Sequence, residues 1–143
     1  MKKIVLDNKN LIAPCGLYCG ECSGFQDGLC EGCLSRKGLC LKYTKICNIY
    51  SCCVDERKLS FCSECKDFPC KKFTKFFNTP VWYNEVTDNL KRIKKIGAEK
   101  FLKEQVKRVE GLIKCAREKG IEHCSKCKEW PCKKLKRPPL VPD

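Results

Sequence analysis

Several features that enzymes commonly carry are missing from this chain of 143 residues. It contains one histidine, whereas catalytic zinc sites usually combine histidine or carboxylate ligands with an open coordination position. A glycine-rich phosphate loop, a nucleophile-elbow motif and a paired-carboxylate motif are also lacking. We interpret the single histidine, His123, as a surface residue or a neighbour of a ligand. We therefore identify no catalytic residue, and an enzyme with an open zinc position is the least favoured hypothesis.

Long apolar runs are lacking as well. The first apolar stretch, Ile4–Leu6, stops at Asp7, whereas a secretory signal needs about 7–15 apolar residues and a small-residue cleavage site. No stretch approaches the roughly 18 apolar residues of a membrane span. We therefore expect a cytoplasmic protein that does not associate with a membrane, in a compartment where thiols stay reduced.

Cysteine is the residue in excess, with 16 copies in the chain. Chains this rich in cysteine are held together by disulfides in oxidising compartments or by metal thiolates in reducing ones. The expected cytoplasmic location favours metal thiolates. Zinc held by four thiolates carries a net charge of about −2, so such sites would offset part of the formal net charge of +13. The basic excess is thus weaker evidence for an anionic partner than it looks.

The length predicts a single cysteine-rich domain, residues 1–143, with four sub-regions of different composition. Residues 15–53 are dense in cysteine and glycine, and residues 85–119 have a helical pattern. Two similar cysteine units occupy residues 53–73 and 115–135. Because residues 15–53 contain few long apolar runs, we expect metal to organise that segment.

Apolar residues recur at helical spacing across residues 85–119. Gly97 divides the pattern into two amphipathic helices, near residues 86–96 and 98–119, and Gly120 is a suitable C-terminal stop. Strand signals are weak: Lys3–Leu6 could pair briefly, and metal knuckles could form small hairpins. The predicted fold class is a small, irregular, metal-stabilised α structure with minor β, in which zinc-knuckle-like cysteine clusters pack with the two helices.

An internal repeat is the most specific signal in the sequence. The spacing C-x8-C-x2-C-x4-C occurs twice, with matching residues around the last three cysteines. Four cysteines per unit match the ligand count of a closed tetrahedral zinc site. The predicted quartets are Cys53, Cys62, Cys65 and Cys70 in the first unit, and Cys115, Cys124, Cys127 and Cys132 in the second.

An aromatic residue and a proline precede the fourth cysteine of each unit, in Phe68–Cys70 and Trp130–Cys132. This step predicts a helix that begins at the fourth cysteine, where exposed backbone N–H groups favour a thiolate. We expect the aromatic rings of Phe68 and Trp130 to pack beside the metal site and keep water from the sulfurs.

The N-terminal cysteines divide less clearly. Two C-x2-C pairs predict a third site made of Cys19, Cys22, Cys30 and Cys33. The remaining Cys15, Cys40, Cys47 and Cys52 could form a further site, and Cys52 could exchange roles with its neighbour Cys53. The predicted cofactor is therefore two to four Zn²⁺ ions. An iron–sulfur cluster is the alternative, because quartets of thiolates hold both kinds of centre.

These observations favour a structural zinc-binding protein that serves as a metal-stabilised interaction module. The alternative is an iron–sulfur, redox or metal-handling protein. Basic clusters admit a protein or nucleic-acid partner, although most such charge runs are solvated faces. The clusters are Lys71-Lys72, Lys91-Arg92, Lys94-Lys95 and Lys133–Arg137, and the aromatic residues near them are Phe73, Phe76, Phe77, Trp82 and Tyr83.

Taken together, these motifs resemble a small prokaryotic family catalogued as domain of unknown function 3795. The resemblance rests on CGLYCGEC at 15–22, CEGC at 30–33, CNIYSC at 47–52, FCSECKDFPCKKF at 61–73 and the helical segment 89–108. It covers nearly the whole chain and implies a cysteine-rich, zinc-binding protein without an established activity. The chain departs from the family in its C-terminal part, where the motif recurs as a second full quartet.

Overall fold

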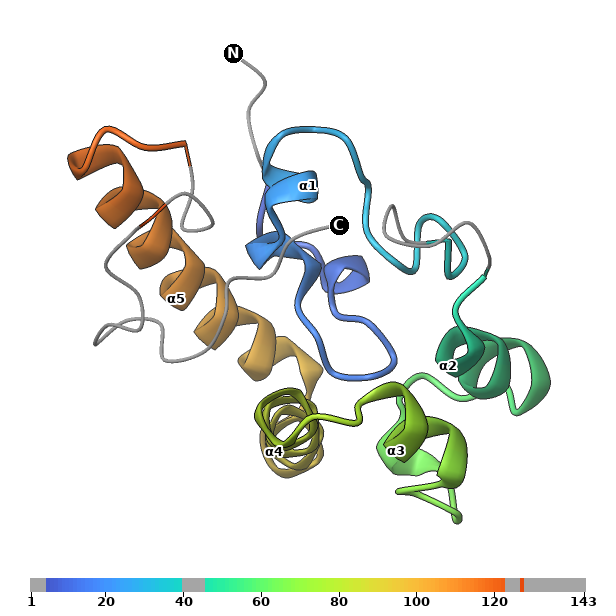
Figure 1. Cartoon of the computed structure of the whole chain (residues 1–143). Helices are drawn as coiled ribbons and strands as arrows, with labels where there is room; N and C mark the ends of the chain where they lie inside the picture. Colours follow the sequence, from blue (N-terminus) through green and yellow to red (C-terminus); the bar gives the residue numbers. More distant parts are fainter. Residues whose placement is uncertain (1–4, 40–45, 123–126, 128–143) are drawn as a thin grey trace.

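The computed structural model describes residues 5–39, 46–122 and 127. The described chain is mostly helical, and its elements are short except for the last two (Figure 1). Before the long helices come η1 (Lys9–Leu11), η2 (Cys19–Glu21), α1 (Ser23–Gln26), α2 (Asn48–Tyr50), the π-helix η3 (Ser51–Glu56), η4 (Cys62–Glu64) and α3 (Lys71–Phe76). The long helices are α4 (Pro80–Ile96) and α5 (Ala98–Glu118).

The two long helices confirm the prediction of an amphipathic pair divided at one glycine. Gly97 separates them with a φ of 89°, a conformation that glycine adopts without strain. The predicted start of the first helix was wrong, because α4 begins at Pro80 rather than near residue 86. Proline is well suited to the first position of a helix, since its missing N–H would have no intrahelical partner there.

Strand structure is nearly absent from the part of the chain that the structure describes. An isolated antiparallel bridge joins Ile12 and Tyr18, and Val5 and Leu6 belong to no strand. Leu6 is instead fixed by the Tyr18 hydroxyl, which donates a hydrogen bond of 2.6 Å to the Leu6 carbonyl oxygen. The expected brief pairing of Lys3–Leu6 is therefore not seen in its described half.

One apolar core joins the cysteine-rich segments to the helix pair. In Figure 1, α5 lies on one side of the N-terminal segment and α2 and α3 lie on the other. Side chains from all of these parts meet in the core, which comprises Leu6, Leu11, Ile12, Tyr18, Ile49, Phe73, Phe77, Val86, Leu90, Ile93, Phe101, Leu102 and Val109. The cysteine-rich segments are therefore not peripheral, because they contribute Tyr18, Ile49 and Phe73 to the core.

Among the helices within residues 5–39 and 46–122, none is both long enough and apolar enough to span a membrane.

Candidate metal centre

The four cysteines of the first unit lie on three short elements that surround one cavity. Cys53 belongs to the π-helix η3, Cys62 begins η4, and Cys65 follows η4 directly. Cys70 is the residue that caps α3. All four line a small cavity of about 20 Å³ that is partly open to solvent, and Cys52 lines it as a fifth cysteine. The sequence predicted the first four as a group and offered Cys52 as a residue that could exchange roles with Cys53.

Cys53 is the innermost of these thiols, with 3% of its surface exposed. Its Sγ donates to the Leu59 carbonyl oxygen at 3.6 Å. A hydrogen bond with Cys62 lowers the pKa of Cys53 and, together with burial, raises the pKa of Cys62. The two sulfurs therefore lie within hydrogen-bonding reach of one another at the wall of the cavity.

Arg57 places a positive charge at the edge of this cavity. Its Nη1 donates to the Cys65 Sγ at 3.1 Å, and its Nη2 donates to the Asp67 carboxylate at 3.0 Å. The pKa of Arg57 is raised above its usual value, first by a hydrogen bond with Cys52 and then by Asp67. Sequence reasoning missed this residue because it lies in a mixed run of charges, residues 55–58, that has the pattern of a solvated turn.

The predicted helix start at the fourth cysteine is confirmed in the first unit. Cys70 precedes the first residue of α3 with an extended backbone, φ −93° and ψ 172°. The Phe68 ring lines the cavity and packs edge-to-face against Phe73 with the ring centroids 5.0 Å apart. The aromatic residue therefore lies beside the thiols, as the sequence indicated.

The N-terminal cysteines are held by tight turns. The Gly32 backbone N–H donates to the Cys30 Sγ at 3.5 Å, and Arg36 Nη1 approaches the same sulfur at 3.9 Å. Gly32 has a φ of 102°, and a Cβ added to it would lie 3.8 Å from the Cys19 Cβ. The structure thus brings Cys19 beside the Cys30–Cys33 turn.

Cys22, the remaining member of the predicted third site, lies at the junction of η2 and α1. Its backbone N–H donates to the Cys19 carbonyl oxygen at 3.0 Å. The first C-x2-C pair is therefore closed by a single turn of backbone, as a knuckle requires.

Of the four cysteines left over by the sequence pattern, the structure describes Cys15, Cys47 and Cys52, and Cys15 lies near Cys47. Cys40 lies outside the described residues, and Cys52 lines the cavity of the first unit. Burial raises the pKa of the Cys15 thiol to about 12, and the neighbouring Cys47 and Cys19 add to the effect. The Cys62 backbone N–H donates to the Pro14 carbonyl oxygen at 3.0 Å. Cys15 therefore lies between the N-terminal turns and the first unit.

The second predicted quartet is only partly described. Cys115 lies near the end of α5, and Cys127 is the isolated described residue beyond it. The other predicted features of this unit, His123, Cys124, Trp130, Pro131 and Cys132, lie outside the described residues. The second site and the structural equivalence of the two units stay predictions.

A ready-made metal site is not present in the described residues. Within residues 5–39, 46–122 and 127, no set of three or more cysteine, histidine or carboxylate side chains is arranged to hold a metal ion. The cavity of the first unit gathers the sulfurs at its wall without bringing them to bonding distance of one point. The assignment of the sixteen cysteines as ligands therefore stays a prediction.

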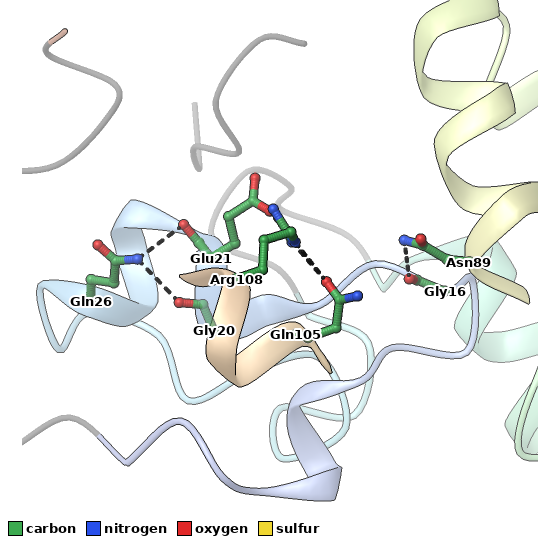
Figure 2. Close-up of polar contacts among 7 residues, drawn as sticks. All are labelled: Gly16, Gly20, Glu21, Gln26, Asn89, Gln105 and Arg108. Carbon is green, nitrogen blue, oxygen red and sulfur yellow. Dashed lines mark hydrogen bonds and ion pairs between the residues drawn. The ribbon is translucent and has the colours of Figure 1, made fainter. Parts of the chain in front are cut away.

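Polar contacts to the long helices hold the N-terminal turns in place (Figure 2). The Glu21 side chain is 4% exposed and forms an ion pair with Arg108 of α5. Arg108 also donates to the Gln105 side-chain oxygen at 2.8 Å. A buried carboxylate is costly unless it is paired and hydrogen-bonded, so this contact fixes the Cys19–Cys22 turn against α5.

A second contact fixes the beginning of the same segment. The Asn89 side-chain amide of α4 donates to the Gly16 carbonyl oxygen at 3.0 Å (Figure 2). Gly16 has a φ of 95° and lies so close to α4 that a Cβ there would meet the Val86 carbonyl oxygen at 3.0 Å. The glycine that follows Cys15 is therefore required by its backbone conformation and by close packing.

The aromatic residues near the basic clusters are largely turned into the protein. Phe73 and Phe77 are 1% and 6% exposed, and Phe76, Trp82 and Tyr83 pack against the same core. Stacking on unpaired bases requires exposed aromatic faces, so this set supports the interior rather than a nucleic-acid surface.

Comparison with known proteins gives a family and no function. No curated protein and no solved structure matches the chain. A family model described as "Protein of unknown function (DUF3795)" matches residues 11–75 and 84–137. The matched residues contain both cysteine units, most of the long helix pair and the N-terminal turns. The resemblance stated from the motifs is confirmed: the chain belongs to this family of unknown function, DUF3795.

Proposed function

We propose that this protein binds structural zinc through clusters of cysteine thiolates, and that the first unit holds one ion through Cys53, Cys62, Cys65 and Cys70. The observation that carries the proposal is the common cavity that these four cysteines line. Zinc in structural sites is almost always held by four sulfur or nitrogen ligands in a closed tetrahedron. The fold already places all four cysteines around one common cavity.

The chemistry of the surrounding residues fits a thiolate site. Arg57 donates to the Cys65 Sγ, and such a donor stabilises a sulfur that carries negative charge. Phe68 lines the cavity and the backbone of Cys70 leads into α3, so water access is limited on that side. When zinc is bound, it would supply cross-links between η3, η4 and α3, which are each too short to be stable alone.

The N-terminal turns support a second ion by the same reasoning. The Gly32 N–H donates to Cys30 Sγ, and Cys19 lies beside that turn. Backbone donors aimed at sulfur are a property of knuckles that hold metal thiolates. We propose Cys19, Cys22, Cys30 and Cys33 as the ligands of this ion, with further ions at the other predicted sets giving two to four in total.

An iron–sulfur cluster is the second candidate, and one observation favours it. The thiols of Cys15 and Cys62 are close enough to influence one another, so the cysteines form a group that extends from the first unit towards the N-terminal turns. A cluster with several metal ions would use such a group, because its thiolate ligands are spread around a larger centre than one zinc ion.

The cellular role that fits a structural zinc protein is an interaction module. Exposed lysines and arginines on α4 and α5 supply a basic surface towards a protein or nucleic-acid partner, including Lys91, Lys94, Lys95 and Lys103. The buried aromatic residues weigh against the nucleic-acid version. If RNA and DNA are not retained even at low salt, that version is excluded, since phosphate contacts are strongest there.

Metal analysis of the purified full chain, combined with a free-thiol count, tests the proposal. We expect a colourless protein with two to four zinc ions, whose thiols become fully reactive after treatment with a strong chelator. Visible absorbance with stoichiometric iron would favour the iron–sulfur alternative. Intact disulfides and no metal in protein prepared from a reducing cytoplasm would contradict both.

A further inference from the structure

Cys52 and Cys53, which are adjacent in η3, line the same cavity. A tetrahedral ion bound by Cys62, Cys65 and Cys70 accepts one further ligand. Cys53 is a predicted ligand of the first unit, yet Cys52 also lines the cavity with Cys62, Cys65 and Cys70. In an α-helix, neighbouring side chains point about 100° apart. The wider turn of a π-helix reduces this angle, and π-helical turns are frequent at functional sites. The hydrogen bond from the Arg57 N–H to the Cys52 carbonyl oxygen, 3.1 Å long, closes such a turn.

The protein supplies polar groups to the cavity besides the cysteines. Cys53 Sγ donates to the Leu59 carbonyl oxygen at 3.6 Å. Arg57 lines the same cavity and donates to the Cys65 Sγ at 3.1 Å. A carbonyl acceptor and a cationic donor are therefore available beside the cysteines when one of them does not bind the metal.

We propose that Cys52 and Cys53 are alternative fourth ligands of the zinc ion in the first unit, and that the ion exchanges between them while Cys62, Cys65 and Cys70 stay bound. This inference rests on the proposed zinc site. It gives the site a means to move its ion between the buried position at Cys53 and the more exposed one at Cys52. Such an exchange is the step that a metal-handling protein needs and that a purely structural site does not.

The exchange is balanced in atoms and charge. The Cys52 thiol releases its proton as its sulfur–zinc bond forms, the Cys53–zinc bond breaks, and Cys53 takes up one proton. The ion remains Zn²⁺ with four thiolates throughout, so no oxidant or reductant is required. The protonated Cys53 then donates to Leu59.

Zinc content of full-length single and double variants tests the redundancy. We expect Cys52→Ser and Cys53→Ser each to keep the wild-type number of zinc ions per chain, and the double variant C52S/C53S to lose one ion. The double variant C62S/C65S, which leaves three cysteines at the cavity, is the matched positive control and also loses one ion. Loss of an ion in either single variant, or its retention in C52S/C53S, would overturn the inference and leave the zinc site standing. Retention of every ion in C62S/C65S would instead overturn the proposed site itself.

A spectroscopic measurement covers the case in which the double variant does not fold. Cadmium replaces zinc in thiolate sites, and the NMR signal of the bound cadmium reports its ligands. We expect the first-unit signal of the wild-type protein to be an exchange average that resolves into two different shifts in Cys52→Ser and Cys53→Ser. One unchanged shift in the wild-type protein and in Cys52→Ser would show a single fixed ligand set and contradict the exchange.

Discussion

The helix pair α4–α5 and the first cysteine unit, residues 53–73, share a core but differ in what can hold them together. The helix pair is long and amphipathic, and its side chains Val86, Leu90 and Val109 are fully buried. The cysteine unit consists of a π-helix, a single 3-10 turn and the start of a six-residue helix. Isolated helices shorter than about 12–15 residues are marginal in water. Apolar packing can therefore maintain the helices, whereas we propose that the cysteine unit also needs its thiols to bind metal.

The largest expected effect is a loss of stability in the cysteine unit, but not in the helix pair, when a metal ligand is removed. Replacing Cys65 by Ser removes a proposed ligand, and a structural zinc site contributes on the order of 10 kcal/mol to folding of its unit. We expect amide hydrogen exchange to become fast in residues 51–76 and to stay slow in the centre of α5. Mass-spectrometric hydrogen exchange with a zinc assay measures both.

The matched control for this comparison is Ser63→Ala, in the same turn. Ser63 is half-buried and is not among the residues that line the cavity, so the variant should keep its zinc and its exchange pattern. Equal protection of residues 51–76 in Cys65→Ser and the control would show that the cysteine unit does not depend on metal.

The next effect concerns the ion pair between Glu21 of the N-terminal turns and Arg108 of α5. Arg108→Met leaves the buried Glu21 carboxylate without its cation, and breaking such a pair costs about 3–5 kcal/mol. We expect urea unfolding of the metal-loaded protein to show a loss in this range. Lys107→Met, on the exposed face of α5, is the control and should change the free energy of unfolding by less than about 0.5 kcal/mol.

The Glu21–Arg108 pair can also be separated from the packing of the arginine stem by a double-mutant cycle. Adding Glu21→Gln to Arg108→Met removes the uncompensated charge, so stability should partly recover. A double variant as unstable as the sum of both single variants would indicate that the pair is not coupled.

A smaller effect tests the apolar packing that holds the helix pair together. Leu90→Ala in α4 removes a side chain that is fully buried, and such substitutions cost about 2–5 kcal/mol. Val81→Ala, on the same helix and 49% exposed, should have little effect. We expect the loss in Leu90→Ala to persist at the same size after chelation of zinc, as measured by thermal unfolding, because it arises from packing alone.

The smallest effect at neutral pH comes from Tyr18, which lies between the two regions. Tyr18→Phe deletes the hydrogen bond to the Leu6 carbonyl oxygen, worth about 1 kcal/mol. Burial raises the pKa of the Tyr18 phenol. Its contribution is therefore fully present below the unfolded-state pKa of about 10 and is lost as the pH rises through the higher folded-state value.

The dependence of stability on alkaline pH tests the role of the Tyr18 phenol. Unfolding curves at pH values from about 8 to about 11 should show a smaller decrease of stability in Tyr18→Phe than in the wild-type protein. Val81→Ala, at an exposed position without a titratable group, should keep the wild-type pH dependence. Identical slopes in Tyr18→Phe and the wild-type protein would contradict the account.

The sequence predicts features that depend on local spacing. The helix pair, its break at Gly97 and the start of α3 at Cys70 follow from periodicity and from turn and cap residues, and the structure confirms them. The early start of α4 at Pro80 was missed, although Trp82 and Tyr83 are half-buried and continue the helical spacing before Val86. The common cavity of the first quartet agrees with the repeated cysteine spacing, although ligation itself stays a prediction.

Contacts between distant parts of the chain could not be predicted from one sequence. Glu21 and Arg108 are 87 positions apart, and Gly16 and Asn89 are 73 apart. No periodic pattern specifies such a pair, since each partner has the local pattern of an ordinary surface residue. The position of Cys52 beside the first quartet likewise depends on the π-helical turn of η3, which has no known local signature in these residues.

The two polar contacts to the N-terminal turns have a mechanical consequence. Asn89 holds Gly16 from α4, and Arg108 holds Glu21 from α5, so one short stretch of chain is tied to both long helices. The helices themselves are joined directly only through Gly97, with a φ of 89°. The segment that carries the first cysteines therefore links α4 and α5 a second time, away from their connection in the chain.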